Sequence, residues 1–235
     1  MTEHTIKRFE NELAELKEKI LAMGGLVEKA VRRSMKSVLN QDAKRAQKVI
    51  ERDKAINALE MEIDSMTRSM LALRQPAAGD LRLVLATIKI VTDLERSGDM
   101  AEGIAEIMLE TEDHPLTNTA TVETMADLVV AQTKVALDAF AQMDVTVALK
   151  CLEQNKKVRS QFKAIQRETL TYMIEDPRKI TAGLLATSIA KNLERIGDHS
   201  VNIAEMVIYI VAGKDVRHMS YNKAADLLGG KSREE

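Results

Sequence analysis

Residues 94–99 read Leu-Glu-Arg-Ser-Gly-Asp, and residues 193–198 read Leu-Glu-Arg-Ile-Gly-Asp. The two stretches lie 99 residues apart, and the likeness resumes in Ile-Ala-Glu at 104–106 and 203–205. Eight of the thirteen positions compared are identical. Self-similarity at a fixed period is typical of duplicated structural units. We therefore predict two copies of one unit in this chain.

The segments around both copies have the periodicity of amphipathic helices. Apolar residues recur at spacings of three and four, as at Leu81, Leu85 and Ile88, and strand-type alternation is not evident. The first predicted helix contains Gly24 and Gly25, a pair expected to loosen it. We predict six long helices and one short one, at residues 5–39, 42–73, 79–113, 122–142, 145–175, 178–211 and 222–228.

Six long helices in two similar halves predict an all-α fold of two tandem, pseudo-symmetric three-helix bundles. A helix of roughly thirty residues is about 45 Å long. The bundles should therefore be elongated, because each helix must bury its apolar stripe along its whole length. We place the first unit at residues 1–113, the second at 114–212 and a loosely held tail at 213–235.

The composition argues against nucleic-acid binding and against membrane insertion. The chain has 34 basic and 36 acidic residues, so it lacks the basic surface that contacts phosphate backbones. Aromatic residues make up only 3%, which disfavours stacking platforms for single strands. No stretch approaches the ~20 apolar residues that span a bilayer, so we expect a soluble protein. Cys151 is the only cysteine, which excludes an intramolecular disulfide.

Each copy of the repeated segment carries two carboxylates on one face of its helix. Glu95 and Asp99 are four residues apart, as are Glu194 and Asp198. Like charges at this spacing cost roughly 0.2–0.5 kcal/mol, so something should offset the repulsion. Solvation with help from neighbouring arginines is one explanation. A bound metal ion is the other, because hard cations bind carboxylate oxygens.

The predicted hairpin between the second and third helices brings further oxygen ligands to the first pair. When residues are counted from the turn at 76–79, one polar face of the second helix lies level with Glu95 and Asp99. That face consists of Asp53, Asn57 and Glu60. The acidic stripe of the third helix continues at Glu102 and Glu106. Asp53, Asn57 and Glu60, together with Glu95 and Asp99, form a candidate oxygen-rich metal site.

The second half differs at the matching positions. Asn155 and Arg159 stand where the first half has Asp53 and Asn57. An arginine opposite Asp198 would form a salt bridge, and its charge would repel a cation. We therefore predict that any metal binds the first half more tightly.

No set of residues indicates catalysis. The chain lacks a Gly-rich phosphate loop, a Cys-x-x-Cys pair and the Glu-x-x-His spacing of di-iron bundles. We interpret His199 as a surface or interface residue, and no motif indicates direct phosphate binding. We predict that the protein is not an enzyme. The alternatives left open are a carboxylate-bound metalloprotein and a helical scaffold without a signalling role.

The doubled Glu-Arg-x-Gly-Asp segments, together with shorter motifs, resemble the PhoU family over roughly residues 9–230. The shorter motifs are Arg-Gln-Pro at 74–76, Asp-Leu-Arg at 80–82, Thr-Tyr-Met-Ile-Glu-Asp at 171–176 and Lys-Asp-Val-Arg-His at 214–218. The resemblance implies a homodimer of six-helix chains in the cytoplasm, peripheral to an inner-membrane complex.

The resemblance also implies a function and a cofactor. Such proteins couple the phosphate ABC transporter, with its ATPase, to a phosphate sensor histidine kinase, and they repress the phosphate-starvation response when phosphate is plentiful. Some members hold divalent or ferric ions on their Glu-x-x-x-Asp motifs. The corresponding residues here are Glu95, Asp99, Glu194 and Asp198. Asp53 keeps the family's usual aspartate of the second helix, whereas Asn155 replaces it in the second half.

Overall fold

The computed structural model describes residues 2–111, 115–116 and 119–229. In these ranges the chain forms helices and no strand. The elements are α1 (Thr2–Asn40), α2 (Ala43–Arg74), α3 (Ala78–Glu110), α4 (Thr119–Gln142), α5 (Val145–Glu175), a 3₁₀ turn η1 (Pro177–Lys179), α6 (Ile180–Ala212) and α7 (Tyr221–Leu227). None of the helices in these ranges has the length and apolar character needed to cross a bilayer. The predicted boundary between residues 113 and 114 lies outside the described residues.

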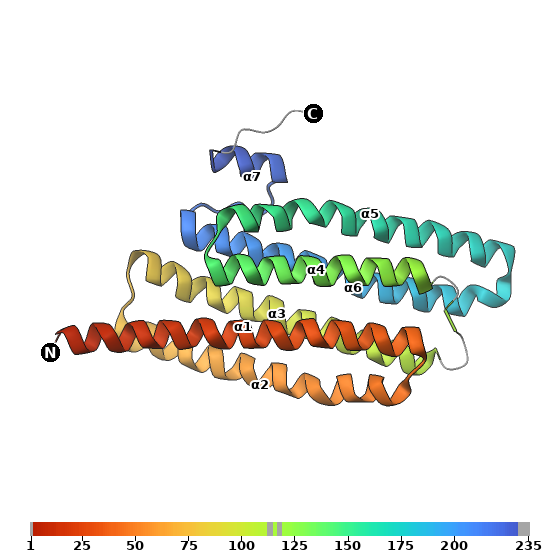
Figure 1. Ribbon diagram of the computed structural model, residues 1–235, viewed down its shortest axis with the longest axis horizontal. Coiled ribbons are helices and arrows are strands. Elements are labelled where there is room, and N and C mark those ends of the chain that lie inside the picture. The colour runs from red at the N-terminus through yellow and green to blue at the C-terminus, as the bar shows by residue number, and fades with distance from the viewer. Residues whose placement is uncertain (1, 112–114, 117–118, 230–235) are drawn as a thin grey trace.

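The six long helices form two three-helix bundles that lie side by side (Figure 1). Helices α1, α2 and α3 pack on one another, as do α4, α5 and α6. Consecutive long helices within each bundle run in opposite directions. The bundles meet where α3 packs along α6 and where α1 packs against α4. The predicted fold class is confirmed.

The interface between the bundles belongs to one continuous hydrophobic core. Leu94 and Leu193, which open the two repeated segments, are both fully buried in it. A polar contact also crosses from α6 to α3. The Nδ1 atom of His199 and the amide nitrogen of Asn202 lie 2.8 and 2.9 Å from Oδ1 of Asp93. His199 is therefore an interface residue, as predicted.

Helix α1 is continuous through its two glycines, so the predicted loosening is wrong. A Cβ atom at Gly24 would overlap the side chain of Leu137 on α4. Gly24 thus allows the two bundles to approach closely, whereas Gly25 faces open space. A helix tolerates glycine at a cost of about 1 kcal/mol, which the packing along α1 offsets.

The tail is held more firmly than predicted. Gly213 ends α6 in the left-handed conformation, with φ 67°, and the chain turns back toward α5. Val216 and Ala224 are fully buried, and α7 packs on α5 (Figure 1). The ammonium of Lys156 lies 5.4 Å from the centre of the Tyr221 ring. The short helix predicted at 222–228 is confirmed to within one residue.

Candidate metal centre

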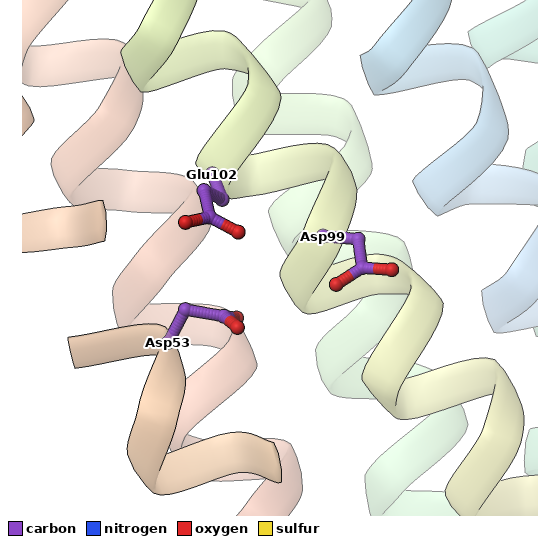
Figure 2. Close-up of side chains that lie close together, drawn as sticks. All are labelled: Asp53, Asp99 and Glu102. Atoms are coloured by element: carbon purple, nitrogen blue, oxygen red, sulfur yellow. The ribbon is translucent and has the colours of Figure 1, made fainter. Parts of the chain in front are cut away.

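Three carboxylates of the first bundle converge between α2 and α3. Asp53 comes from α2, and Asp99 and Glu102 come from α3. One oxygen atom of each lies within 4.8 Å of the others. Figure 2 shows the three side chains facing the space between the two helices. They meet because the short α2–α3 connection makes the helices antiparallel and sets their register.

Asp53 is the most buried member of this group, with only 6% of its surface exposed. Its Oδ2 accepts a hydrogen bond of 2.8 Å from the side-chain amide of Asn57. Its Oδ1 and the Oδ1 of Asn57 are buried and have no hydrogen-bond partner among the described residues. A buried polar atom without a partner costs about 1–3 kcal/mol. A cation between the helices would satisfy these oxygens.

The repeated glycine allows α2 to approach the carboxylates. A Cβ atom at Gly98 would lie 2.9 Å from Cδ1 of Ile56 and 3.1 Å from Oδ1 of Asp53. Real Cβ contacts of that length are very rare, so any larger residue would displace the side chains of Ile56 and Asp53 on α2. The glycine of the repeat is therefore explained by close helix packing.

Burial and mutual repulsion raise the pKa of several carboxyls in this region. Burial, followed by the charges of Asp99 and Glu60, raises the pKa of Glu95 to about 7. Burial is also the largest cause of the raised pKa of Asp53 and of Glu102. The cluster is therefore unfavourable as a set of free anions, and a cation or protons would relieve the repulsion.

The structure brings together part of the predicted set. Asp53, Asn57 and Asp99 meet as expected. Glu95 lies outside the group of converging oxygens, and the charges of Asp99, Glu60 and Asp53 raise its pKa after the larger effect of burial. Glu102 takes a ligand position although our candidate set did not include it. Its spacing of three residues from Asp99 was the signal, because both then lie on one face of α3.

The carboxylates of the second bundle already have partners. Oδ1 of Asp198 accepts hydrogen bonds of 3.0 Å from the amide of Asn155 and from Nη2 of Arg159. Glu194 pairs with the ammonium of Lys191 at 2.5 Å. The predicted contact between Arg159 and Asp198 is therefore present.

Metal-free protein is expected to lose stability as the pH rises from about 5 to about 8. The pKa of Glu95 in the folded state, about 7, exceeds its ordinary value of 4.5. The folded state thus binds this proton more tightly than the unfolded state. The stabilisation is complete below the ordinary pKa and is lost as the pH passes through the folded-state value. One pKa unit corresponds to about 1.4 kcal/mol, and solvent screening of this partly exposed group reduces the effect to the order of 1–2 kcal/mol.

Urea unfolding at both pH values, with a chelator present, measures this loss. Glu95→Gln should reduce the difference between the two pH values. Glu194→Gln is the matched control, because Glu194 lies beside a cation. The pKa of Glu205 is likewise raised to about 7, chiefly by burial. Glu205 is present in the parent chain and in both variants, so a difference in pH dependence between Glu95→Gln and the parent chain reports Glu95 alone. An unchanged pH dependence in Glu95→Gln would contradict the electrostatic account of the cluster.

Comparison with known proteins identifies the family. The family model of the PhoU domain matches residues 20–108 and 122–207, one segment in each bundle. A phosphate-specific transport system accessory protein PhoU homolog of Pseudomonas putida is 43% identical over 95% of this chain and 88% of its own length. The accessory protein PhoU of Escherichia coli is 37% identical over 100% of this chain and 98% of its own length.

Solved structures agree with the sequence relatives. The crystal structure of PhoU from Pseudomonas aeruginosa matches with a TM-score of 0.85 and 42% identity, and covers 88% of this chain and 100% of its own. The phosphate transport system regulatory protein PhoU from Streptococcus pneumoniae matches with a TM-score of 0.83 and 28% identity, over 88% of this chain and 99% of its own. The chain therefore belongs to the PhoU family.

Proposed function

We propose that this protein is a cytoplasmic regulator of phosphate homeostasis, peripheral to an inner-membrane complex. It couples the phosphate ABC transporter to a sensor histidine kinase and represses the phosphate-starvation response when phosphate is plentiful. The observation that carries the proposal is likeness along nearly the whole chain to proteins named phosphate-specific transport system accessory proteins. Those names describe an accessory role, and the proposal assigns no reaction to this chain. The homodimer implied by the family resemblance stays a prediction.

The surface chemistry supports a role in contacts with proteins. A chain with 34 basic and 36 acidic residues has no overall attraction to nucleic acid. Mixed surface charge suits docking on partners whose charges are complementary. The helices are long, so a single chain presents several separate faces to different partners.

The full-length tagged chain is expected to co-purify with the phosphate transporter ATPase and the sensor kinase. The experiment uses gently solubilised native membranes from cells grown with ample phosphate, followed by mass spectrometry. The same membranes with an untagged chain provide the background. Absence of both partners from the tagged sample, or nanomolar binding to DNA at physiological salt, would contradict the adaptor function.

We also propose a cation site in the first bundle, formed by Asp53, Asp99 and Glu102 with Glu95 nearby. All-oxygen ligand sets suit divalent or ferric ions. The supporting observation is the buried, unpartnered Oδ1 of Asp53, which lies beside two further carboxylates. A bound cation would neutralise the cluster and hold α2 against α3.

A further inference from the structure

A cavity of about 830 Å³ lies between the two bundles and the tail. Its walls come from α3, α5 and α6, and the segment 217–221 lines it from the tail. We call it the interbundle cavity. Small-molecule sites typically occupy roughly 300–1,000 Å³. The cavity is therefore large enough for a ligand of nucleotide size.

The lining is cationic although the whole chain is slightly acidic. Five lysine or arginine side chains face three acidic ones, whereas the net charge of the chain is −2. The cations come from α3, α5 and the tail, so no single helix accounts for them. They are Lys89, Arg96, Lys156, Arg159 and Arg217. Such a concentration of positive charge in a concave site attracts anions.

Two of the three acidic groups, Asp198 and Glu205, oppose an anion only weakly. Asp93 accepts hydrogen bonds from His199 and Asn202, and Asp198 is paired with Arg159. Burial, followed by the charge of Asp215, raises the pKa of Glu205 to about 7, although Arg217 and Asp93 also act on it. Glu205 therefore carries less than a full negative charge near neutral pH.

Several cations retain donors for a ligand. Arg96 has no hydrogen bond or ion pair within the described ranges. Arg159 donates to Asp198 through Nη2, and its other guanidinium nitrogens have no hydrogen bond to any described residue. Lys156 lies over the Tyr221 ring and has no hydrogen bond or ion pair with the residues that the structure describes. Arg217, by contrast, is bonded to Asp215. Arg96, Lys156 and Arg159 are therefore the cations best placed to contact an anion.

The rest of the lining is suited to an apolar or planar group. Leu152 on α5 and Val201 and Met206 on α6 form an apolar wall. The tail adds the side chains of Ser220 and Tyr221. Arginine and lysine bind phosphate oxygens through charge-assisted hydrogen bonds. An apolar wall beside such donors matches a ligand with both a phosphate and a less polar part.

We propose that the interbundle cavity binds a phosphate-bearing small molecule, with Arg96, Lys156 and Arg159 contacting its anionic groups. A nucleotide would fill the cavity, whereas inorganic phosphate would occupy a small part of it. Both repeats and the tail contribute to the lining, so occupancy would link the two bundles. The site does not depend on the proposed regulatory role.

Isothermal titration calorimetry with the full chain tests the proposal. ATP and inorganic phosphate are titrated separately, with a chelator present, at low and at high salt. We expect ATP to bind more tightly than phosphate, and both to weaken as salt screens the cations. In the double variant Arg96→Gln with Lys156→Gln, which keeps the pair of Arg159 with Asp198, the Kd for ATP should rise at least tenfold.

Arg167→Gln is the matched control, because Arg167 is exposed on α5 and does not line the cavity. It should leave binding unchanged. Circular dichroism confirms that the variants keep their helices. Binding of phosphate alone, weakened by the double variant, supports the site and assigns it to the free ion. Absence of binding by both ligands at millimolar concentration, or equal affinity in the parent chain and the double variant, overturns the proposal.

Discussion

In the cation site proposed for the first bundle, changing Asp53 and Asp99 together to Asn is expected to remove most of the bound metal. Both residues contribute to the only group of three converging metal-ligand side chains found among the described residues. Asparagine keeps the size of the side chain but removes its charge, so folding should be little affected. Loss of a residue that only hydrogen-bonds to a metal ligand typically costs roughly 10- to 100-fold in metal affinity. Loss of two ligands should cost at least as much.

The matching change in the second bundle should remove little metal. The variant Asp198→Asn with Glu194→Gln alters carboxylates that already pair with Arg159 and Lys191. Val201 occupies the position that corresponds to Glu102, so the third ligand is also missing there. Fixed positive charge and the missing ligand both disfavour a cation.

Elemental mass spectrometry separates these outcomes. It measures the metal content of each variant after dialysis against a weak chelator. The two double variants serve as controls for each other because they occupy repeat-related positions. Equal losses would show that the salt bridge of Arg159 with Asp198 does not exclude a cation. Full retention of metal in Asp53→Asn with Asp99→Asn would refute the first-bundle site.

Deleting the gene for this protein is expected to switch on phosphate-starvation genes in phosphate-rich medium. The expectation follows from the proposed repression of that response, and the effect should be large because deletion removes the proposed repressor entirely. A reporter placed behind a phosphate-starvation promoter measures it. A plasmid carrying the full-length chain should restore repression in the deletion strain. Unchanged reporter activity after deletion would leave the scaffold alternative standing.

Local signals explain why the helices could be predicted closely. Helix ends depend on nearby residues, as at Asp144, whose Oδ1 accepts a hydrogen bond of 2.7 Å from the amide nitrogen of Thr146 and so caps α5. Amphipathic periodicity depends only on positions within one helix. The loosening expected at Gly24 was wrong because local sequence does not reveal contacts between distant residues. The role of that glycine depends on Leu137, which is distant in the sequence and packs against it only after folding.

The first-bundle site could be predicted in part because its ligands lie on one hairpin. A short connection fixes the register of α2 and α3, so counting from the turn placed the face of Asp53 and Asn57 opposite Asp99. The same counting placed Arg159 opposite Asp198. Glu102 was missed although the same count places it level with Asp53, since Asp53 lies 23 residues before residue 76 and Glu102 lies 23 residues after residue 79, whereas Glu95 lies level with Glu60.

The sequence by itself determined the helical class, the duplication and the different charges of the two halves, because periodicity, repeats and charge are properties of neighbouring residues. Only the tertiary structure decided that the bundles share one core and that the tail packs on α5. It also decided that Arg96 of the first repeat and Arg159 of the second line one cavity. Such contacts join residues far apart in the chain, and their geometry depends on how whole helices pack against one another.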